Sequence, residues 1–324
     1  MLLLRDRVST ISIEFVWHLL HPQVQKPRPI LVMWGPVRRG YFEGSALRMT
    51  IRAMTPEDLD IVLHWAADEG WNPGLGDAEA FHAADPAGFL IKEVAGEPVA
   101  AISVVNHDPD FAFLGLYLCK PEFRGQGHGM EVWRAGIEHA GPRSIGLDGV
   151  PDQQQNYARS GFVKYGTTIR YKGQITPEAD PRIRPASPGD IDTLVARDAR
   201  ATGIRRTAFA RAWFAHSPTR QTWVLMDGED IAGFATFRRC RLGSKIGPVY
   251  ALSGTDARAL LAANPFATSD EPCFVDVSDP DAPLAKMIKS LDFEATFETA
   301  RMFRGAQPSS SPAQFQAIAT MELG

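Results

Sequence analysis

Six consecutive residues, Arg124 to Gly129, have the types and spacing expected of an anion-binding loop. Glycine occupies every second position, between an apolar, strand-like stretch at 111–119 and apolar residues at helical spacing from Met130 onward. A strand that passes into a helix through glycines leaves backbone N–H groups free at the positive helix end, with no Cβ to block a pyrophosphate. The sequence therefore predicts an anion cradle at residues 124–129.

Glycine-rich runs of this length also occur in ordinary turns and in dinucleotide-binding folds. A dinucleotide fold needs the run directly after the first strand of a βαβ unit. Here the run lies late in its domain, after residues that are typical of antiparallel strands, and this disfavours the dinucleotide interpretation. An ordinary turn is the alternative that the sequence leaves open.

The elements that position this run follow from hydrophobic periodicity and turn residues. Thr55, followed by the acidic Glu57 and Asp58, predicts the start of a helix that continues to Gly70. Gly96 and Glu97 predict a hairpin turn between two strands within residues 88–105. The predicted order is β-α-α-β-β-β-α-β-α-β, with the remaining elements expected at 77–84, 111–119, 130–140, 144–150, 152–160 and 162–171.

An internal repeat indicates that the chain holds two domains built on one plan. Residues 51–60 are echoed by 183–192, and residues 96–100 by 228–232, both at an offset of 132. We therefore expect an α/β (α+β) protein with two tandem domains, each a mixed, mostly antiparallel sheet flanked by helices. The expected boundaries are a first half at 49–173, a linker at 174–182, a second half at 183–306, and a linker and tail at 307–324.

The two ends of the chain differ from these halves in composition. Residues 1–48 carry seven Lys/Arg against three acidic residues and interrupt any apolar signal segment with charges, so we expect a non-native or disordered extension. Pro308 to Pro312 is typical of a flexible connector. The apolar character that returns at 314–323 predicts a segment that docks on the body, as either a strand or a helix.

Bulk composition limits the classes of function. The chain is 44% hydrophobic and 22% charged, with a net charge of -4, which is typical of a globular protein. No basic surplus points to nucleic acid, no apolar stretch is long enough for a membrane span, and three cysteines without metal-ligand spacing indicate reduced core residues. We expect a cytoplasmic protein, monomer or homodimer, without a metal.

The loop and its surroundings resemble the GNAT superfamily of N-acetyltransferases. The family signature Q/R-x-x-G-x-G/A is met by Arg124, Gly127 and Gly129, and the preceding Pro121-Glu122-Phe123 and later Tyr157-x-x-x-Gly161-Phe162 are also similar, so the likeness covers the first half. The resemblance implies that acetyl-CoA is the co-substrate. It implies coenzyme contacts from two strand residues and the loop, namely Leu118, Cys119, Arg124, Gly125, Gln126, Gly127, His128 and Gly129.

The resemblance also implies roles at the reacting atoms. Tyr157 matches the family's tyrosine general acid, although Val150 stands where the family usually has an asparagine, and packing on the sheet is the alternative role for Tyr157. Glu69 is a candidate base, or equally a solvated charge at a helix end. Trp71 and Asn72 follow it, where the family commonly binds the acceptor.

The second half has lost these features. At the same offset, Asp256, Ala259 and Leu261 replace the loop residues, and Ile288 lies opposite Tyr157 at an offset of 131, so this half resembles a degenerate GNAT domain. Residues 245–250 (KIGPVY) and 300–305 (ARMFRG) are similar to the carboxy-terminal domain of YitH-like bacterial tandem acetyltransferases. The resemblance therefore implies an enzyme that moves an acetyl group from acetyl-CoA to a primary amine of a small molecule or peptide. The alternative is an acyl-CoA-binding sensor or regulatory module without turnover.

Overall fold

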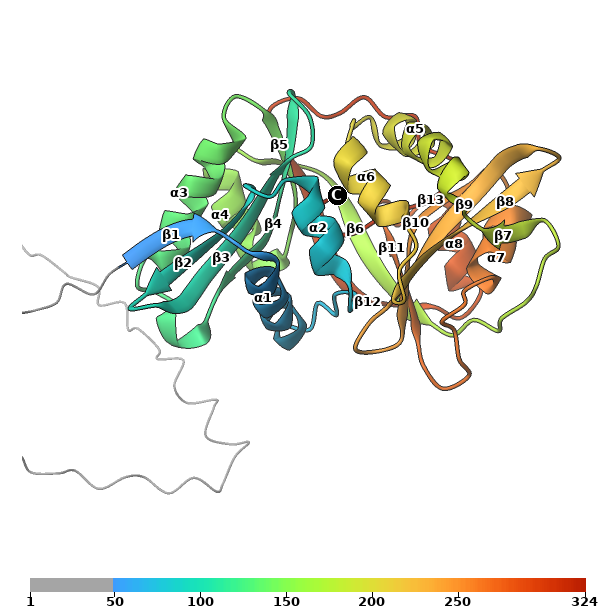
Figure 1. Cartoon of the computed structure of the whole chain (residues 1–324), viewed down its shortest axis with the longest axis horizontal. Coiled ribbons are helices and arrows are strands. Elements are labelled where there is room, and N and C mark those ends of the chain that lie inside the picture. The colour runs from blue at the N-terminus through green and yellow to red at the C-terminus, as the bar shows by residue number, and fades with distance from the viewer. Residues whose placement is uncertain (1–48) are drawn as a thin grey trace, which may run out of the picture. The chain divides into compact units, whose positions relative to one another are not determined.

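The computed structural model describes residues 49–324, and the expectations made for residues 1–48 lie outside this part. The first helix begins where the sequence predicts, because the Thr55 hydroxyl accepts the Asp58 N–H while the Asp58 carboxylate accepts the Thr55 N–H. In the first half (Figure 1) the elements are β1 (Met49–Ala53), α1 (Pro56–Asp68), α2 (Asp77–Ala84), β2 (Phe89–Val94), β3 (Glu97–Asn106), β4 (Phe111–Cys119), the 3-10 turn Pro121–Phe123, α3 (His128–Ala140), β5 (Ser144–Gly149), the 3-10 turn Pro151–Gln153, α4 (Gln154–Arg159) and β6 (Val163–Gly173).

The second half repeats this order, including the capping arrangement. As in the Thr55–Asp58 pair, the Asp190 carboxylate accepts the Ser187 N–H, and here it also accepts the Ser187 hydroxyl. The elements are β7 (Ile183–Pro185), the 3-10 turn Pro188–Asp190, α5 (Ile191–Thr202), α6 (Thr207–Phe214), β8 (Arg220–Asp227), β9 (Asp230–Arg239), β10 (Ser244–Ala251), α7 (Gly254–Ala262), β11 (Cys273–Val277), α8 (Pro283–Lys289) and β12 (Glu294–Arg304).

The strands of both halves join one continuous sheet, in the order β1-β2-β3-β4-β5-β12-β6-β11-β10-β9-β8-β7. Among the described strands, only β4·β5 and β10·β11 run parallel, which confirms the predicted mixed, mostly antiparallel character. The last strand of each half is exchanged. β12 pairs with β5 of the first half, and β6 pairs with β11 of the second, so neither half closes its sheet alone.

Two equivalent ion pairs lie across this exchange. Arg170 on β6 contacts Asp276 on β11 at 2.7 Å and 2.8 Å, and Arg301 on β12 contacts Asp148 on β5 at 2.8 Å and 2.7 Å. Both arginines make two-pronged contacts with their carboxylates, a geometry that favours strong, directional pairing. The exchange is therefore held by the same side-chain pair in both halves.

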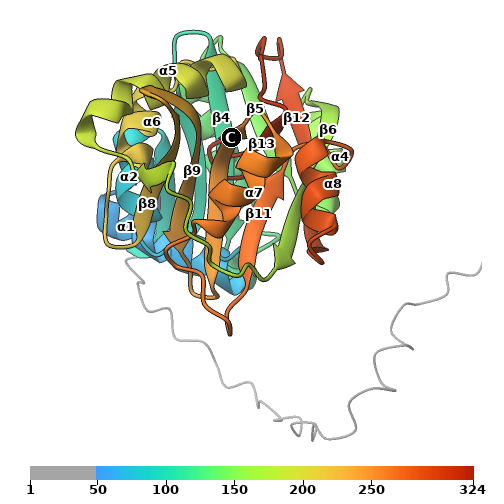
Figure 2. The same ribbon diagram turned by 90° about the vertical axis from the view of Figure 1, so that its right-hand side faces the viewer.

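Helices cover both faces of the sheet, and the core continues from one half to the other. On one face, Phe81 of α2 stacks on Trp213 of α6 with ring centres 6.0 Å apart. On the other face, α7 and α8 cover the strands of the second half (Figure 2), with Leu260 and Ile288 fully buried. No helix within residues 49–324 has the length and apolar character needed to cross a bilayer.

The tail after β12 docks back on the body, as the sequence predicts. It forms the short strand β13 (Phe315–Ala317), which pairs antiparallel with β10. It then enters the interior, where Ala319 and Leu323 join the core shared by the two halves. The chain end lies between the two halves (Figure 1).

Candidate active site

The glycine-rich run forms an open junction between β4 and α3. Gly125 and Gly127 have φ angles of 76° and 90°, in the left-handed region that glycine adopts readily. An added Cβ at either position would meet no atom within 4 Å. The backbone N–H groups of residues 125–130 donate no hydrogen bond to any acceptor among the described residues, and no side chain caps α3. These donors therefore remain available to an anion.

A cavity of about 460 Å³ opens in front of this junction. Gly129 lies in the first turn of α3, close to the Tyr117 hydroxyl, and His128 packs edge-on against Phe123 with ring centres 6.0 Å apart. The Gln126 side chain turns away and donates to the Glu122 carbonyl. Seven of the eight predicted coenzyme residues line the cavity, all except Gln126: Leu118, Cys119, Arg124, Gly125, Gly127, His128 and Gly129.

Strand β4 separates from its parallel neighbour where the cavity begins. The pairing of β4 with β5 ends at Leu114 and Leu147. Leu116 has φ of 43°, and the register between β3 and β4 shifts at this point, which marks a bulge. Within residues 49–324, residues 115–119 of β4 therefore have no strand partner on this edge, and such an edge can pair with an extended ligand.

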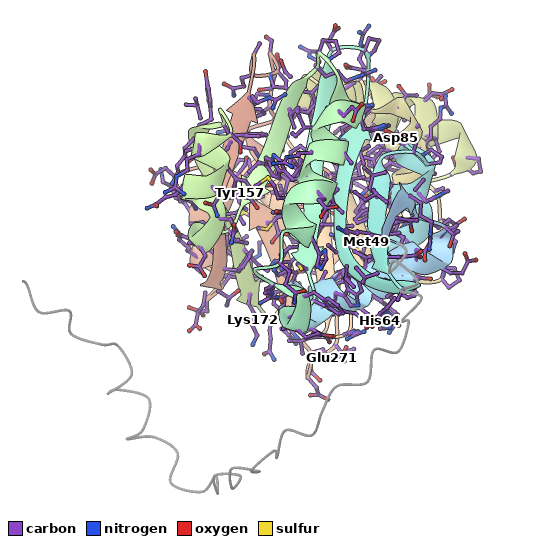
Figure 3. The ribbon with its side chains drawn as sticks, turned by 90° about the vertical axis from the view of Figure 1, so that its left-hand side faces the viewer. Met49, His64, Asp85, Tyr157, Lys172 and Glu271 are labelled. Carbon is purple, nitrogen blue, oxygen red and sulfur yellow. The ribbon has the colours of Figure 1, made fainter. Side chains whose placement is uncertain are left out.

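Tyr157 is placed by aromatic packing at the inner end of the site. Its ring stacks on Trp133 of α3 with centres 5.6 Å apart and meets Phe162 edge-on (Figure 3 labels Tyr157). Burial, with a smaller contribution from Tyr117, raises the pKa of the Tyr157 hydroxyl. A phenol in this environment keeps its proton at neutral pH, so the side chain is present in the form that can donate a proton.

The three candidate residues on the acceptor side, Glu69, Trp71 and Asn72, lie in different surroundings. The Glu69 carboxylate pairs with Arg124 of the cradle at 2.5 Å and lines the large cavity. The Asn72 side chain bonds the backbone of Leu242 in the second half and lines none of the cavities described here. Only Trp71 lies between the cradle and the inner end of the site.

A second, smaller cavity of about 70 Å³ continues inward from the first. Trp71, Tyr117, Val150 and Gln153 line both cavities, and Tyr157 lines the smaller one. The Trp71 carbonyl accepts from Arg170 at 2.6 Å and from Lys245 at 3.0 Å, so both halves fix its position. Burial lowers the pKa of Lys245 to about 8.

Several residues of the smaller cavity escaped the sequence reasoning. They come from β4, from β5, from the exchanged strands and from the tail: Gly115, Leu116, Tyr117, Asp148, Arg170, Phe297, Thr299, Met321 and Glu322. Arg170 and Arg301 were a usable signal, since near the ends of the two halves the repeat continues at an offset of 131 and these two arginines correspond. The tail residues carry no motif, and only the three-dimensional course of the chain reveals them.

In the second half the equivalent of the cradle is closed. The Ser253 hydroxyl accepts the Asp256 N–H at 3.1 Å at the start of α7. The Asp256 carboxylate pairs with Arg182 at 3.0 Å. The helix start thus has its own side-chain cap and an acidic first turn, both unfavourable for an anion.

Comparison with known proteins gives this architecture a family. A profile described as "Acetyltransferase (GNAT) family" matches residues 57–162, and one described as "Acetyltransferase (GNAT) domain" matches residues 194–315. The chain is 34% identical over 282 residues to a protein named holothin acyltransferase from Pseudoalteromonas sp. (strain SANK 73390), covering 85% of this chain and 94% of the relative.

Solved structures show the same fold at lower identity. A putative acetyltransferase from Pyrococcus horikoshii superposes with a TM-score of 0.71 at 21% identity, over 90% of this chain and 99% of that one. A tandem GNAT protein from the clavulanic acid biosynthesis pathway gives a TM-score of 0.54 at 13% identity, over 82% and 100%. Together with the two matched domains, these likenesses show that the chain belongs to the GNAT superfamily of acyltransferases and carries two GNAT domains in tandem.

Proposed function

We propose that this acyltransferase moves an acetyl group from acetyl-CoA to a primary amine of a small molecule or peptide. The observation that carries the proposal is the junction of the two cavities at Trp71, Tyr117, Val150 and Gln153. The larger cavity has the free N–H groups of residues 125–130 at one side, and the smaller one contains Tyr157. A thioester at the junction would have an anchor behind it and an acid beside it.

In this proposal the first half, residues 49–173, holds the chemistry. The N–H groups of residues 125–130 bind the coenzyme diphosphate, and the unpaired edge of β4 at Leu118 and Cys119 binds its pantetheine arm. The amine nitrogen attacks the thioester carbonyl carbon, the new C–N bond forms, and the C–S bond breaks. The sulfur leaves with the bonding electron pair and takes the proton of the Tyr157 hydroxyl, and the nitrogen gives up its surplus proton, which returns to Tyr157 through water.

In this proposal the second half, residues 183–306, binds no coenzyme of its own and instead holds residues of the first-half site in position. Its β12 completes the sheet beside β5, and its Lys245 and Asp276 fix Trp71 and Arg170. The paired Glu69 is a less suitable base than the sequence suggested, because its carboxylate already neutralises Arg124.

The test is to incubate the chain with acetyl-CoA and a panel of amines that includes holothin, the compound in the relative's name, and to detect the thiol released. Amine-dependent thiol release with matching acetylated product supports the proposal. Tight binding of acetyl-CoA without thiol release across the panel would instead support a sensor.

A further inference from the structure

The tail occupies, in the second half, the strand edge that stays open in the first. Strand β13 pairs with Val249, Tyr250 and Ala251 of β10. These positions are the repeat equivalents of Tyr117, Leu118 and Cys119 on β4. In both halves a bulge precedes them, and the parallel pairing has ended. The protein's own tail therefore lies where a pantetheine arm would lie in the first half.

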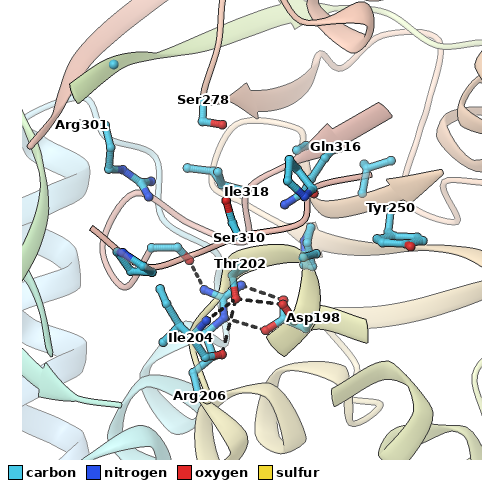
Figure 4. Close-up of a pocket in the computed structure, with 18 of the residues that line it drawn as sticks. Asp198, Thr202, Ile204, Arg206, Tyr250, Ser278, Arg301, Ser310, Gln316 and Ile318 are labelled. Carbon is cyan, nitrogen blue, oxygen red and sulfur yellow. Dashed lines mark hydrogen bonds and ion pairs between the residues drawn. The ribbon is translucent and has the colours of Figure 1, made fainter. Parts of the chain in front are cut away.

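A cavity of about 250 Å³ beside this edge is the second-half counterpart of the small cavity near Tyr157. Figure 4 shows the tail residues Ser310, Gln316 and Ile318 lining it, opposite Tyr250. The ion pair between Arg206 and Asp198, drawn in the same view, is buried and complete. The second half thus retains the shape of an acceptor site and uses it to hold the tail.

From this anchor the tail crosses into the first half. Two equivalent glycines mark its path: a Cβ on Gly247 would lie 2.2 Å from the Ile318 carbonyl oxygen, and one on Gly115 would lie 2.2 Å from the Glu322 carbonyl oxygen. Both glycines allow a close backbone approach that no other residue permits. Met321 and Glu322 then line the small cavity together with Tyr157 and Trp71.

Glu322 is one of the two acidic residues that line this cavity, and its carboxylate has few hydrogen-bond partners. Glu322 is 4% exposed, and among residues 49–324 its carboxylate accepts one hydrogen bond, from the Thr320 hydroxyl, and forms no ion pair. The other acidic residue of the cavity, Asp148, already accepts from Arg301 and Thr168. A buried carboxylate needs further donors, which a bound amine supplies.

Three basic side chains lie near Glu322 at longer range, and each donates to another group. Arg170 donates to Asp276 and to the Trp71 carbonyl, and Lys245 donates to the same carbonyl. Arg238 donates to Asp77 and to the Ala319 carbonyl. These cations lie close enough to Glu322 to interact with it electrostatically, and within residues 49–324 none of them forms an ion pair with it.

We propose that Glu322 binds the amino group of the acceptor and takes one of its protons during acetyl transfer. In this proposal the second half holds the tail and thereby positions Glu322. The inference rests on the proposed function. As the nitrogen bonds to the carbonyl carbon, its proton passes to the Glu322 carboxylate, while the departing sulfur takes the Tyr157 proton. Transfer from Glu322 to Tyr157 through water then restores both groups. The acceptor class is a primary amine whose amino end fits the cavity of about 70 Å³.

The first test compares Glu322→Gln with Glu298→Gln, a matched change at an exposed position on β12. Glu322→Gln lowers kcat/KM for the amine about 100-fold or more and leaves the Kd for acetyl-CoA unchanged, whereas the control retains both constants. Glu322→Asp, which keeps the charge, recovers part of the loss. Wild-type kcat/KM in a folded Glu322→Gln variant overturns the role of Glu322.

The second test moves the tail from a distance. Gly247→Ala pushes on Ile318 in the second half, and Gly189→Ala, whose Cβ would meet its nearest atom at an ordinary 3.7 Å, is the control. We expect Gly247→Ala to lower kcat/KM for the amine while acetyl-CoA binds as in wild type. Unchanged amine kinetics overturn the anchoring role. A wild-type chain that releases no thiol with any amine overturns the proposed function itself, so the two failures are distinguishable.

Discussion

The exchanged strands give a stability prediction that follows from one buried ion pair. Asp276→Asn removes the charge that neutralises Arg170, a buried residue that is 3% exposed. Breaking a buried pair by removing one partner costs about 3 to 5 kcal/mol, because the remaining charge stays buried. At about 2 to 4 °C per kcal/mol for a chain of this size, the midpoint of thermal unfolding should fall by roughly 6 to 20 °C.

The same pair predicts a recovery that distinguishes charge burial from lost packing. Replacing both partners by apolar residues, Arg170→Met with Asp276→Leu, should restore most of the lost free energy of unfolding, since a buried pair and an apolar pair are often similar in stability. Urea unfolding of the wild type, the two single variants and the double variant measures this directly. Asp68→Asn, in an exposed pair with Arg241, is the control and should not change stability measurably.

Two outcomes would refute this reasoning. A loss below about 1 kcal/mol for Asp276→Asn would mean that Arg170 finds water or another partner in the folded chain. If the double variant loses as much free energy of unfolding as the two single variants together, then packing, and not the buried charge, accounts for the loss. Burial alone would raise the pKa of Asp276. The positive charge and hydrogen bonds of Arg170 outweigh this effect, so the pKa of Asp276 lies below its ordinary value. The stabilisation should therefore disappear as the pH falls below about 4.

Three further predictions concern the site and its support. Gly127→Glu places a carboxylate at the cradle and should weaken acetyl-CoA binding, measured by calorimetry, roughly 100- to 1,000-fold. The control, Gly96→Glu, lies at a hairpin turn with a similar φ of 82° and equal space, and it should bind acetyl-CoA as the wild type does. Equal acetyl-CoA affinities of the Gly127→Glu variant and the wild type would exclude the cradle. Tyr157→Phe should lower kcat about 100-fold with unchanged coenzyme affinity, and the exposed Tyr165→Phe should have no effect; an unaltered kcat contradicts the acid role. Lys245 has its pKa lowered to about 8 by burial, so the folded state binds fewer protons than the unfolded state between that value and 10.5. The free energy of unfolding should thus rise by roughly 3 kcal/mol across this pH range relative to Lys245→Met, and parallel pH curves would contradict it.

Local patterns in the sequence predicted most elements of the first half because their causes are local. The Thr55 cap, the Gly96 turn and the alternation of strand residues each act over a few positions, and the structure confirms the elements they predict. The open backbone between β4 and α3 was predictable for the same reason, since the glycines at 125 and 127 determine it. That it binds an anion stays a prediction.

The exchange of β6 and β12 was not predictable in this way. Both strands have a similar alternation of apolar and polar residues, so by pattern alone either could pair with β5. The observed pairing depends on ion pairs that Arg170 and Arg301 form with carboxylates more than 100 residues away in the sequence. The small cavity depends on the same long-range pairing and on the tail. Glu69 shows the converse: its position beside the site was foreseen, but its pairing with Arg124 required the fold.

The most direct measurement of the central claim is a crystal structure of the chain with coenzyme A bound. Diphosphate oxygens should lie within about 3.2 Å of backbone nitrogens among residues 125–130, and no coenzyme should bind at Ser253 to Asp256 of the second half. A diphosphate bound in the second half, or anywhere away from the β4–α3 junction, would contradict that claim.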